Sequence, residues 1–144
     1  MKKINNRRKS RELVMKSLYR GIVNDFDYSV IKKDITEDPD YIRSDQKLLD
    51  SLLQGIESNY VLISDNIKKF TDKKLDDLSP IELSILILAT YELIFSLDTP
   101  FKVIINEALE ITKTYGSVEG YKFVNGILDK LAKEHRVSEV ILVS

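Results

Sequence analysis

The most apolar stretch of the chain extends from Ser79 to Phe95 and predicts a buried central helix. The polar residues that interrupt it are Glu82, Ser84, Thr90 and Glu92. Ser79 can cap a helix, Pro80 suits the first helical position, and Glu82 favours the positive end of the helix dipole. A helix that is apolar on nearly every side is either buried all round or crosses a membrane. Its glutamates, and the lack of about 18 uninterrupted apolar residues, favour a buried helix and no membrane contact.

Apolar residues recur every three or four positions through most of the remaining chain, which predicts further helices around the central one. The first of these follows a basic N-terminal segment and ends near Asn24. Further helical patterns cover residues 27–35, 41–63, 61–70, 100–115 and 118–136. Residues 71–77 form a polar joint. Residues 137–144 are rich in β-branched side chains, so we expect them to be extended or loosely docked.

Residue types that begin and end helices support these limits. Asp27, Thr99 and Ser117 can each cap a helix N-terminus. Pro100 would then take the first helical position after Thr99. Gly116 suits the C-terminal end of the preceding helix.

Composition favours a single helical domain. Three prolines and five glycines in 144 residues leave little room for turn-rich β structure. We therefore predict an all-α fold, a compact bundle of about seven helices over residues 1–144. The polar joint would divide it into two packed halves, roughly 1–72 and 78–136. The absence of cysteine excludes disulfides and fits a reducing cytoplasm, and residues 1–11 lack the apolar core of an export signal.

Side chains that could support catalysis are few. His135 is the single histidine and lies near the end of the last predicted helix, where we expect a solvated side chain. Motifs for phosphate loops, dinucleotide binding, zinc proteases and serine nucleophiles are absent. The acidic residues are not spaced to converge on a metal. We therefore expect no enzyme activity, no cofactor and no metal.

The basic N-terminal segment is the first candidate binding feature. Its basic residues are Lys2, Lys3, Arg7, Arg8, Lys9 and Arg11. An isolated run of lysines would favour a solvated tail, but arginine offers a planar fork of donors that suits phosphate. On a helix, Arg7 and Arg11 lie one turn apart. These features favour nucleic acid as the ligand, and the net charge of −1 indicates a local footprint rather than a broad one.

Phe123 on the last predicted helix is the second candidate. It lies roughly 100° around the helix from Val124, which belongs to the apolar stripe. An aromatic residue in this place more often fills the edge of a core. Beside a cation such as Lys122 it can instead stack on a nucleic-acid base. The residues alone leave both interpretations open.

Three segments together resemble the NusB family of bacterial transcription antitermination factors. The first is RRKSRELVMKSLY, from Arg7 to Tyr19. The second is ATYELIFSLDTPFKVIINEALEITKTYG, residues 89–116, and the third is YKFVNGILDKLAKE, residues 121–134. Their order and spacing are those of the family, and the resemblance spans almost the whole chain.

The resemblance implies an all-helical fold of two packed halves and a role in transcription. Members of the family bind boxA, a short single-stranded sequence in nascent ribosomal RNA, as a heterodimer with the small-subunit ribosomal protein called NusE. The complex joins RNA polymerase and other Nus factors and suppresses premature termination. Some members are monomers and others are homodimers, so both states stay open.

The resemblance also implies which residues bind. RNA contacts are expected at Arg7, Arg8, Lys9, Arg11, Tyr19, Lys102, Lys122 and Phe123. The partner surface lies largely on the second half, where Glu82 is the first position to carry over. From the residues alone, Glu82 fits equally well as a helix-start acid that complements the dipole.

Two other functions fit parts of the sequence. A helical protein–protein interaction module without an RNA role would leave the basic segment solvated or docked on an acidic protein. The RNA-binding domain of an RNA methyltransferase is disfavoured, since no cofactor-binding domain follows in the sequence.

Overall fold

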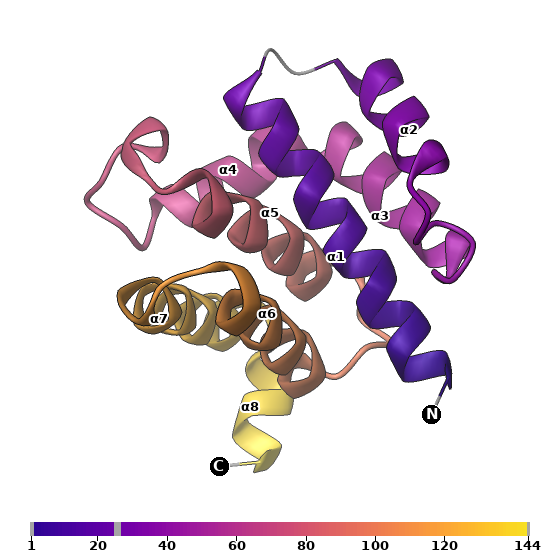
Figure 1. Ribbon diagram of the computed structural model, residues 1–144. Helices are drawn as coiled ribbons and strands as arrows, with labels where there is room; N and C mark the ends of the chain where they lie inside the picture. Colours follow the sequence, from indigo (N-terminus) through magenta and orange to yellow (C-terminus); the bar gives the residue numbers. More distant parts are fainter. Residues whose placement is uncertain (1, 25–26, 144) are drawn as a thin grey trace.

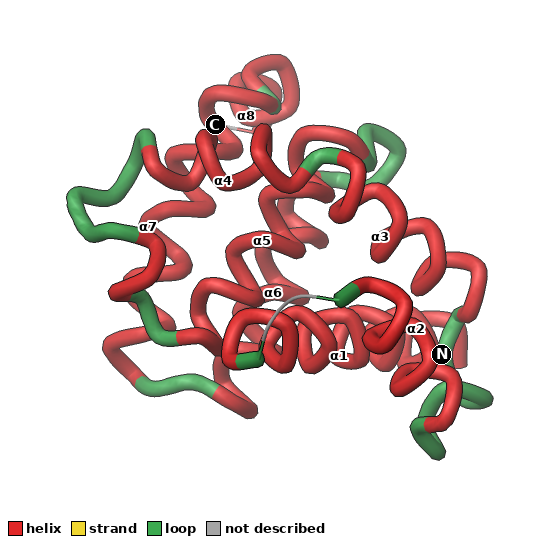
Figure 2. The backbone as a smooth tube through the Cα atoms, turned by 90° about the horizontal axis from the view of Figure 1, so that it is seen from above, coloured by secondary structure: helices red, strands yellow, loops and turns green. Residues whose placement is uncertain are grey.

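The computed structural model describes residues 2–24 and 27–143, and its backbone is helical almost throughout (Figure 1). The helices are α1 (Lys2–Val23), α2 (Tyr28–Glu37), α3 (Gln46–Ser58), α4 (Tyr60–Lys68), α5 (Pro80–Phe95), α6 (Phe101–Tyr115), α7 (Val118–His135) and α8 (Val137–Val143). A short 3-10 helix, Leu75–Asp77, lies between α4 and α5. No strand occurs within the described ranges (Figure 2). The predicted all-α bundle is confirmed.

The apolar α5 is the central helix. Its side chains from Leu83 to Thr90 are buried all the way round, including the polar Ser84. It contacts α1, α3, α4, α6 and α7. In the view of Figure 1, α2 to α4 lie above α5 and α6 to α8 lie below it. Each large apolar side chain buried in this way stabilises the folded state by roughly 1.5–3 kcal/mol, so α5 is the centre of the core. No helix of the described chain is long and apolar enough to cross a membrane.

Helix ends follow the predicted caps with two exceptions, Ser79 and Thr99. Ser79 is the N-cap residue of α5, but its side chain makes no cap hydrogen bond. The side chains of Asp27 and Ser117 accept backbone N–H groups in the first turns of α2 and α7. Gly116 is the C-cap residue of α6. The prediction for Thr99 is wrong by one position, because Pro100 itself is the N-cap residue of α6. Its extended backbone, with φ −58° and ψ 142°, leads directly into the helix at the next residue.

Three segments differ from the sequence prediction. The first helix begins at Lys2, so the basic segment is part of this helix and does not precede it. Residues 41–44 form turns rather than the start of a helix, and α3 begins after its cap residue Asp45. Residues 137–143 are helical rather than extended. The physical reason for this last difference is the buried arginine directly before them.

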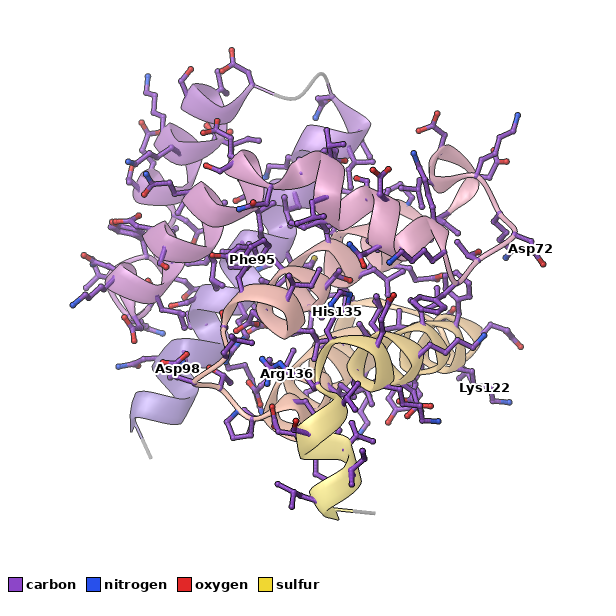
Figure 3. All side chains as sticks on the ribbon, turned by 180° about the vertical axis from the view of Figure 1, so that it is seen from behind. Asp72, Phe95, Asp98, Lys122, His135 and Arg136 are labelled. Atoms are coloured by element: carbon purple, nitrogen blue, oxygen red, sulfur yellow. The ribbon has the colours of Figure 1, made fainter. Side chains whose placement is uncertain are left out.

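Arg136 directly follows α7. Its side chain is buried and hydrogen-bonded to the C-terminal end of α5. Its guanidinium donates hydrogen bonds of 2.7–3.1 Å to the carbonyl oxygens of Glu92, Leu93, Ser96 and Thr99. The carbonyls of Glu92 and Ser96 also accept the backbone N–H groups of Ser96 and Thr99, so Arg136 adds a second bond to each of these two. The same guanidinium donates to Glu139 of α8, whose carboxylate also accepts the backbone N–H of Phe101. Arg136 thus joins α7, α8 and the connection between α5 and α6, where Asp98 lies (Figure 3).

A second buried arginine links α1 to α5. The Nε and Nη2 atoms of Arg11 each donate to a carboxylate oxygen of Glu92 at 2.9 Å. The two side chains are 3% and 2% exposed, so the pair is sealed from water. Burial by itself disfavours the charge on Arg11, but the hydrogen bonds and charge of Glu92 outweigh this effect and raise the pKa of Arg11. Arg11 therefore stays charged and determines how α1 lies on α5.

Gly55 of α3 provides a test of the packing around α5. A Cβ atom at position 55 would overlap the hydroxyl end of Tyr91, whose ring lies against this glycine. We expect Gly55→Ala to lower the free energy of unfolding by about 1–3 kcal/mol, as overpacking does. Gly126→Ala on α7 is the control, because no atom lies within 4 Å of a Cβ there. Helix propensity alone then predicts a gain of up to about 1 kcal/mol. Urea unfolding of both variants measures the difference, and equal effects would contradict the proposed packing.

The Arg11–Glu92 pair provides a second test. Arg11→Ala leaves the Glu92 carboxylate buried without its partner, which we expect to lower the free energy of unfolding by about 3–5 kcal/mol. Lys133→Ala removes an exposed pair with Asp129, 3.0 Å long, and should change stability by less than about 1 kcal/mol. Thermal unfolding monitored by circular dichroism compares the two. A small effect of Arg11→Ala would mean that water reaches Glu92.

Candidate nucleic-acid interface

Arg8 of α1 forms a fork-shaped ion pair with Glu107 of α6. Its Nε donates to Oε1 at 3.0 Å, and its Nη2 donates to Oε2 at 2.7 Å. The Arg8 side chain is 40% exposed, whereas that of Glu107 is only 10% exposed. The hydrogen bonds and charge of Glu107 raise the pKa of Arg8. Arg8 is thus a charged group at the surface that rests on a nearly buried carboxylate.

Arg11 differs from Arg8 although both were predicted to contact RNA. Its guanidinium lies in the core with both donor groups on Glu92. Only 3% of its side chain is exposed, so little of the guanidinium faces solvent. The RNA contact of Arg11 stays a prediction, and we leave Arg11 out of the candidate interface because its donors are occupied by Glu92.

Arg7, Lys102 and Lys9 lie near the N-terminal ends of α1 and α6. A cavity of about 340 Å³ between these helices is lined by Arg7, Arg11, Val103, Asn106 and Glu107. Lys102 is exposed and directly precedes Val103 in the first turn of α6. Lys9 faces the acidic region that follows α2, with its Nζ 3.6 Å from Asp40. The structure therefore brings Arg7 to the Arg8–Glu107 pair and turns Lys9 away toward a carboxylate.

Two lysine–tyrosine pairs continue this surface toward α7. The Nζ of Lys16 lies 5.5 Å from the ring centre of Tyr115, whose hydroxyl donates to Glu12 at 3.2 Å. The Nζ of Lys113 lies 6.0 Å from the ring centre of Tyr121. A cation within about 6 Å of an aromatic face is attracted to it. Each pair places a positive charge beside a flat apolar surface. Our sequence analysis did not find these pairs, because their members come from different helices.

A second cavity lies where α6 ends and α7 begins. Its volume is about 330 Å³, and it is lined by Thr112, Lys113, Gly116, Ser117, Val118, Tyr121 and Lys122. Lys122 is exposed and points outward in Figure 3, on the opposite side of the molecule from Asp98. The cavities lined by Arg7 and by Lys122 thus lie toward opposite ends of α6, which is 15 residues and about 22 Å long.

These residues form one surface, which we call the α1–α6–α7 strip. It comprises Arg7, Arg8, Lys16, Lys113, Lys122, Tyr115 and Tyr121. Its cations outnumber its rings, and each ring has a lysine over its face: Lys16 lies over Tyr115 and Lys113 lies over Tyr121. Such a surface can bind phosphates through its cations and stack bases on its rings, as single-stranded nucleic acid requires.

Phe123 lies apart from this strip, whereas Tyr19 lies one turn of α1 beyond Lys16, at the edge of the strip. Phe123 is two residues beyond Tyr121, so it projects about 200° around α7 from that ring. It packs partly against the core, and the Nζ of Lys73 lies 5.3 Å from its ring centre. Tyr19 is 37% exposed on α1, about 16 Å along the helix from Arg8. Both interpretations of Phe123 thus keep support, since its ring touches the core and a cation.

Glu82, the predicted partner residue, lies in the first turn of α5 and packs against the start of α7. A Cβ atom at Gly120 would lie 2.5 Å from its Oε2. Its carboxylate is only partly exposed there. Position 120 must therefore be glycine for the side chain to lie in this place, and Glu82 is oriented by α7 as well as by its own helix.

His135 is not the solvated residue that we expected from the sequence. Its Nε2 lies 2.8 Å from Oδ1 of Asn66 on α4, and burial lowers its pKa. The His135 side chain is partly buried because the end of α7 packs beside α4. Within the described ranges, no group of three histidine, cysteine, aspartate or glutamate residues is arranged to hold a metal ion.

Comparison with known proteins agrees with this architecture. Residues 8–133 match the model of the NusB family. The transcription antitermination protein NusB of Methylobacillus flagellatus is 43% identical over 134 residues, 93% of this chain and 87% of that protein. That of Neisseria meningitidis serogroup C is 43% identical over 133 residues, 92% and 94% of the two chains. The solved structure of T. maritima NusB is similar with a TM-score of 0.76 and 39% identity, over 89% of this chain and 91% of that one. The chain belongs to the NusB family.

Proposed function

We propose that this protein is an RNA-binding transcription antitermination factor. It binds boxA single-stranded RNA of nascent ribosomal transcripts together with the ribosomal protein NusE, and joins RNA polymerase and other Nus factors. The names of its relatives, transcription antitermination protein NusB, support this role. The observation that carries the proposal is the pair of lysines, Lys16 and Lys113, over the rings of Tyr115 and Tyr121, together with the exposed Arg8 on α1.

Phosphates bind to the cations of the strip. Arg7 and Arg8 supply forked donors at one end, and Lys122 supplies a point charge at the other. Lys102, which is exposed and precedes Val103 of the cavity that Arg7 lines, adds a further positive charge. Each phosphate contact releases counterions and contributes roughly −0.7 to the salt slope of binding to a single strand.

Bases stack on the tyrosines of the strip. In the free protein Lys16 and Lys113 cover the rings of Tyr115 and Tyr121. A base that takes the ring face moves the lysine toward the adjoining phosphate, so both contacts are made together. Each stacked base contributes roughly 1–3 kcal/mol. Phe123 offers a similar ring and cation on the other side of α7, where a longer RNA continues.

The strip alone provides a small contact area, so the partner adds affinity. Glu82 lies at the N-terminus of α5, near the start of α7 where the strip ends. A partner that contacts this carboxylate therefore lies next to the bound RNA and extends its binding surface.

RNA binding can be measured by fluorescence anisotropy of a labelled boxA-like single strand. We expect weak, salt-dependent binding by this protein alone and much tighter binding when the NusE partner is present. The double variant Arg7→Ala, Arg8→Ala should flatten the salt slope by roughly 1.4, the sum of two lost phosphate contacts. Lys47→Ala is the control, because this exposed lysine of α3 lies outside the strip.

Three results would contradict the proposal. An unchanged salt slope in the arginine double variant would show that Arg7 and Arg8 do not contact phosphates. Equal binding of boxA and a scrambled strand with NusE present would remove the sequence specificity. No RNA binding with or without NusE would favour a helical interaction module whose partner is a protein.

The partner contact has its own test. We expect Glu82→Gln to weaken binding of NusE while RNA binding by the protein alone stays unchanged, because Glu82 lies outside the strip. Glu119→Gln on the first turn of α7 is the control, since it removes an exposed charge nearby. Isothermal titration calorimetry with NusE compares the variants, and equal losses for both would show a general charge effect rather than a contact of Glu82.

A further inference from the structure

Arg8 has one occupied edge and one open edge. Its Nε and Nη2 atoms donate to Glu107, whereas Nη1 has no hydrogen-bond acceptor among the described residues. A guanidinium has five N–H donors, so several remain available when one carboxylate is bound. The side chain is 40% exposed, and its open edge can therefore meet a ligand from solvent.

We propose that Glu107 is a positioning residue for RNA binding: its carboxylate holds the inner edge of Arg8 so that the outer edge faces an RNA phosphate. The inference rests on the proposed function and adds to it a residue that itself never touches RNA. It also gives a role to an acid that lies within a basic surface.

Glu107 suits this role because its own side chain cannot move far. It is 10% exposed, and α6 buries Ile104, Ala108 and Ile111 in the core around it. A carboxylate fixed on such a helix restricts the rotamers of the arginine that it binds. Less side-chain freedom is then lost when the phosphate arrives, which favours binding.

The Arg11–Glu92 pair shows what distinguishes the Arg8 pair. Both pairs use Nε and Nη2 on two carboxylate oxygens. Arg11 is sealed in the core and therefore acts only in the fold. Arg8 has the same inner contact but an exposed outer edge, which is the arrangement that a phosphate-binding arginine requires.

For removal of the Glu107 charge, the proposal and simple electrostatics predict opposite changes in RNA affinity. Glu107 is an anion within a surface that binds a polyanion, so removal of its charge should strengthen RNA binding if charge alone mattered. A positioning role predicts weaker binding. In Glu107→Gln one amide oxygen still accepts from Arg8, but the amide N–H₂ faces the other donor, so the fork is lost.

The experiment compares Glu107→Gln with Glu110→Gln in the anisotropy assay with boxA-like RNA. Both changes remove one negative charge from α6, and Glu110 lies 3.6 Å from Lys113 rather than on Arg8. We expect Glu107→Gln to weaken binding about three- to tenfold and to flatten the salt slope by up to roughly 0.7. Glu110→Gln should bind as tightly as the unchanged protein or more tightly.

Two further variants exclude a general loss of structure. In an Arg8→Ala background, Glu107→Gln should have no additional effect on RNA binding, because the residue that it positions is gone. Arg8→Lys keeps the charge and leaves Glu107 in place but lacks the fork, and it should weaken binding about as much as Glu107→Gln. Circular dichroism at the assay temperature checks that each variant is folded.

The outcomes separate this inference from the proposed function. Tighter or unchanged binding by Glu107→Gln overturns the positioning role, as does Arg8→Lys that binds like the unchanged protein. If Arg8→Ala itself leaves RNA binding and its salt slope unchanged, the proposed function of this end of the strip fails.

Discussion

The ion pair between Arg11 and Glu92 constrains the whole N-terminal helix. Because both groups are sealed from water, α1 can lie on α5 only in the register that keeps them together. Arg8 is one turn earlier on α1, so this register directs it to α6, where Glu107 meets it. Charge alone would make the basic segment a solvated tail. The buried ion pair instead makes it part of a helix with a fixed position. The charges exposed at its surface have defined positions because one charge is buried.

The sequence was sufficient to predict the elements that depend on local chemistry. The all-round apolar character of residues 79–95 predicts a central helix, and Asp27 and Ser117 cap helices as expected. The residues themselves indicated the basic N-terminal segment and Phe123 beside Lys122. The family resemblance added Tyr19, Lys102 and Glu82, and all these sites remain proposals. Arg8 and Arg11 look alike in the sequence, and only their tertiary partners distinguish the exposed residue from the buried one. Glu92 lies 81 positions from Arg11, a separation that no local pattern indicates.

The parts of the candidate site that the sequence did not reveal also depend on partners from distant parts of the chain. The rings of Tyr115 and Tyr121 fit the apolar pattern of α6 and α7, so they look like ordinary core residues. Their lysine partners come from other helices, and the pairing depends on the angle at which these helices pack. Helical periodicity alone places Phe123 and Tyr121 on different sides of α7, but which neighbours each ring meets depends on tertiary packing.

The buried Arg136 has a consequence for the order in which the protein matures on the ribosome. It follows Leu93, one of the carbonyl groups that it satisfies, by 43 positions. At roughly 5–20 residues per second, the end of α5 waits roughly 2–9 s after its own synthesis for this guanidinium. The hydrogen bonds at the end of the most apolar helix are therefore completed only after α6 and α7 have been made. During that interval its open end depends on water, or on whatever binds nascent chains, for its hydrogen bonds.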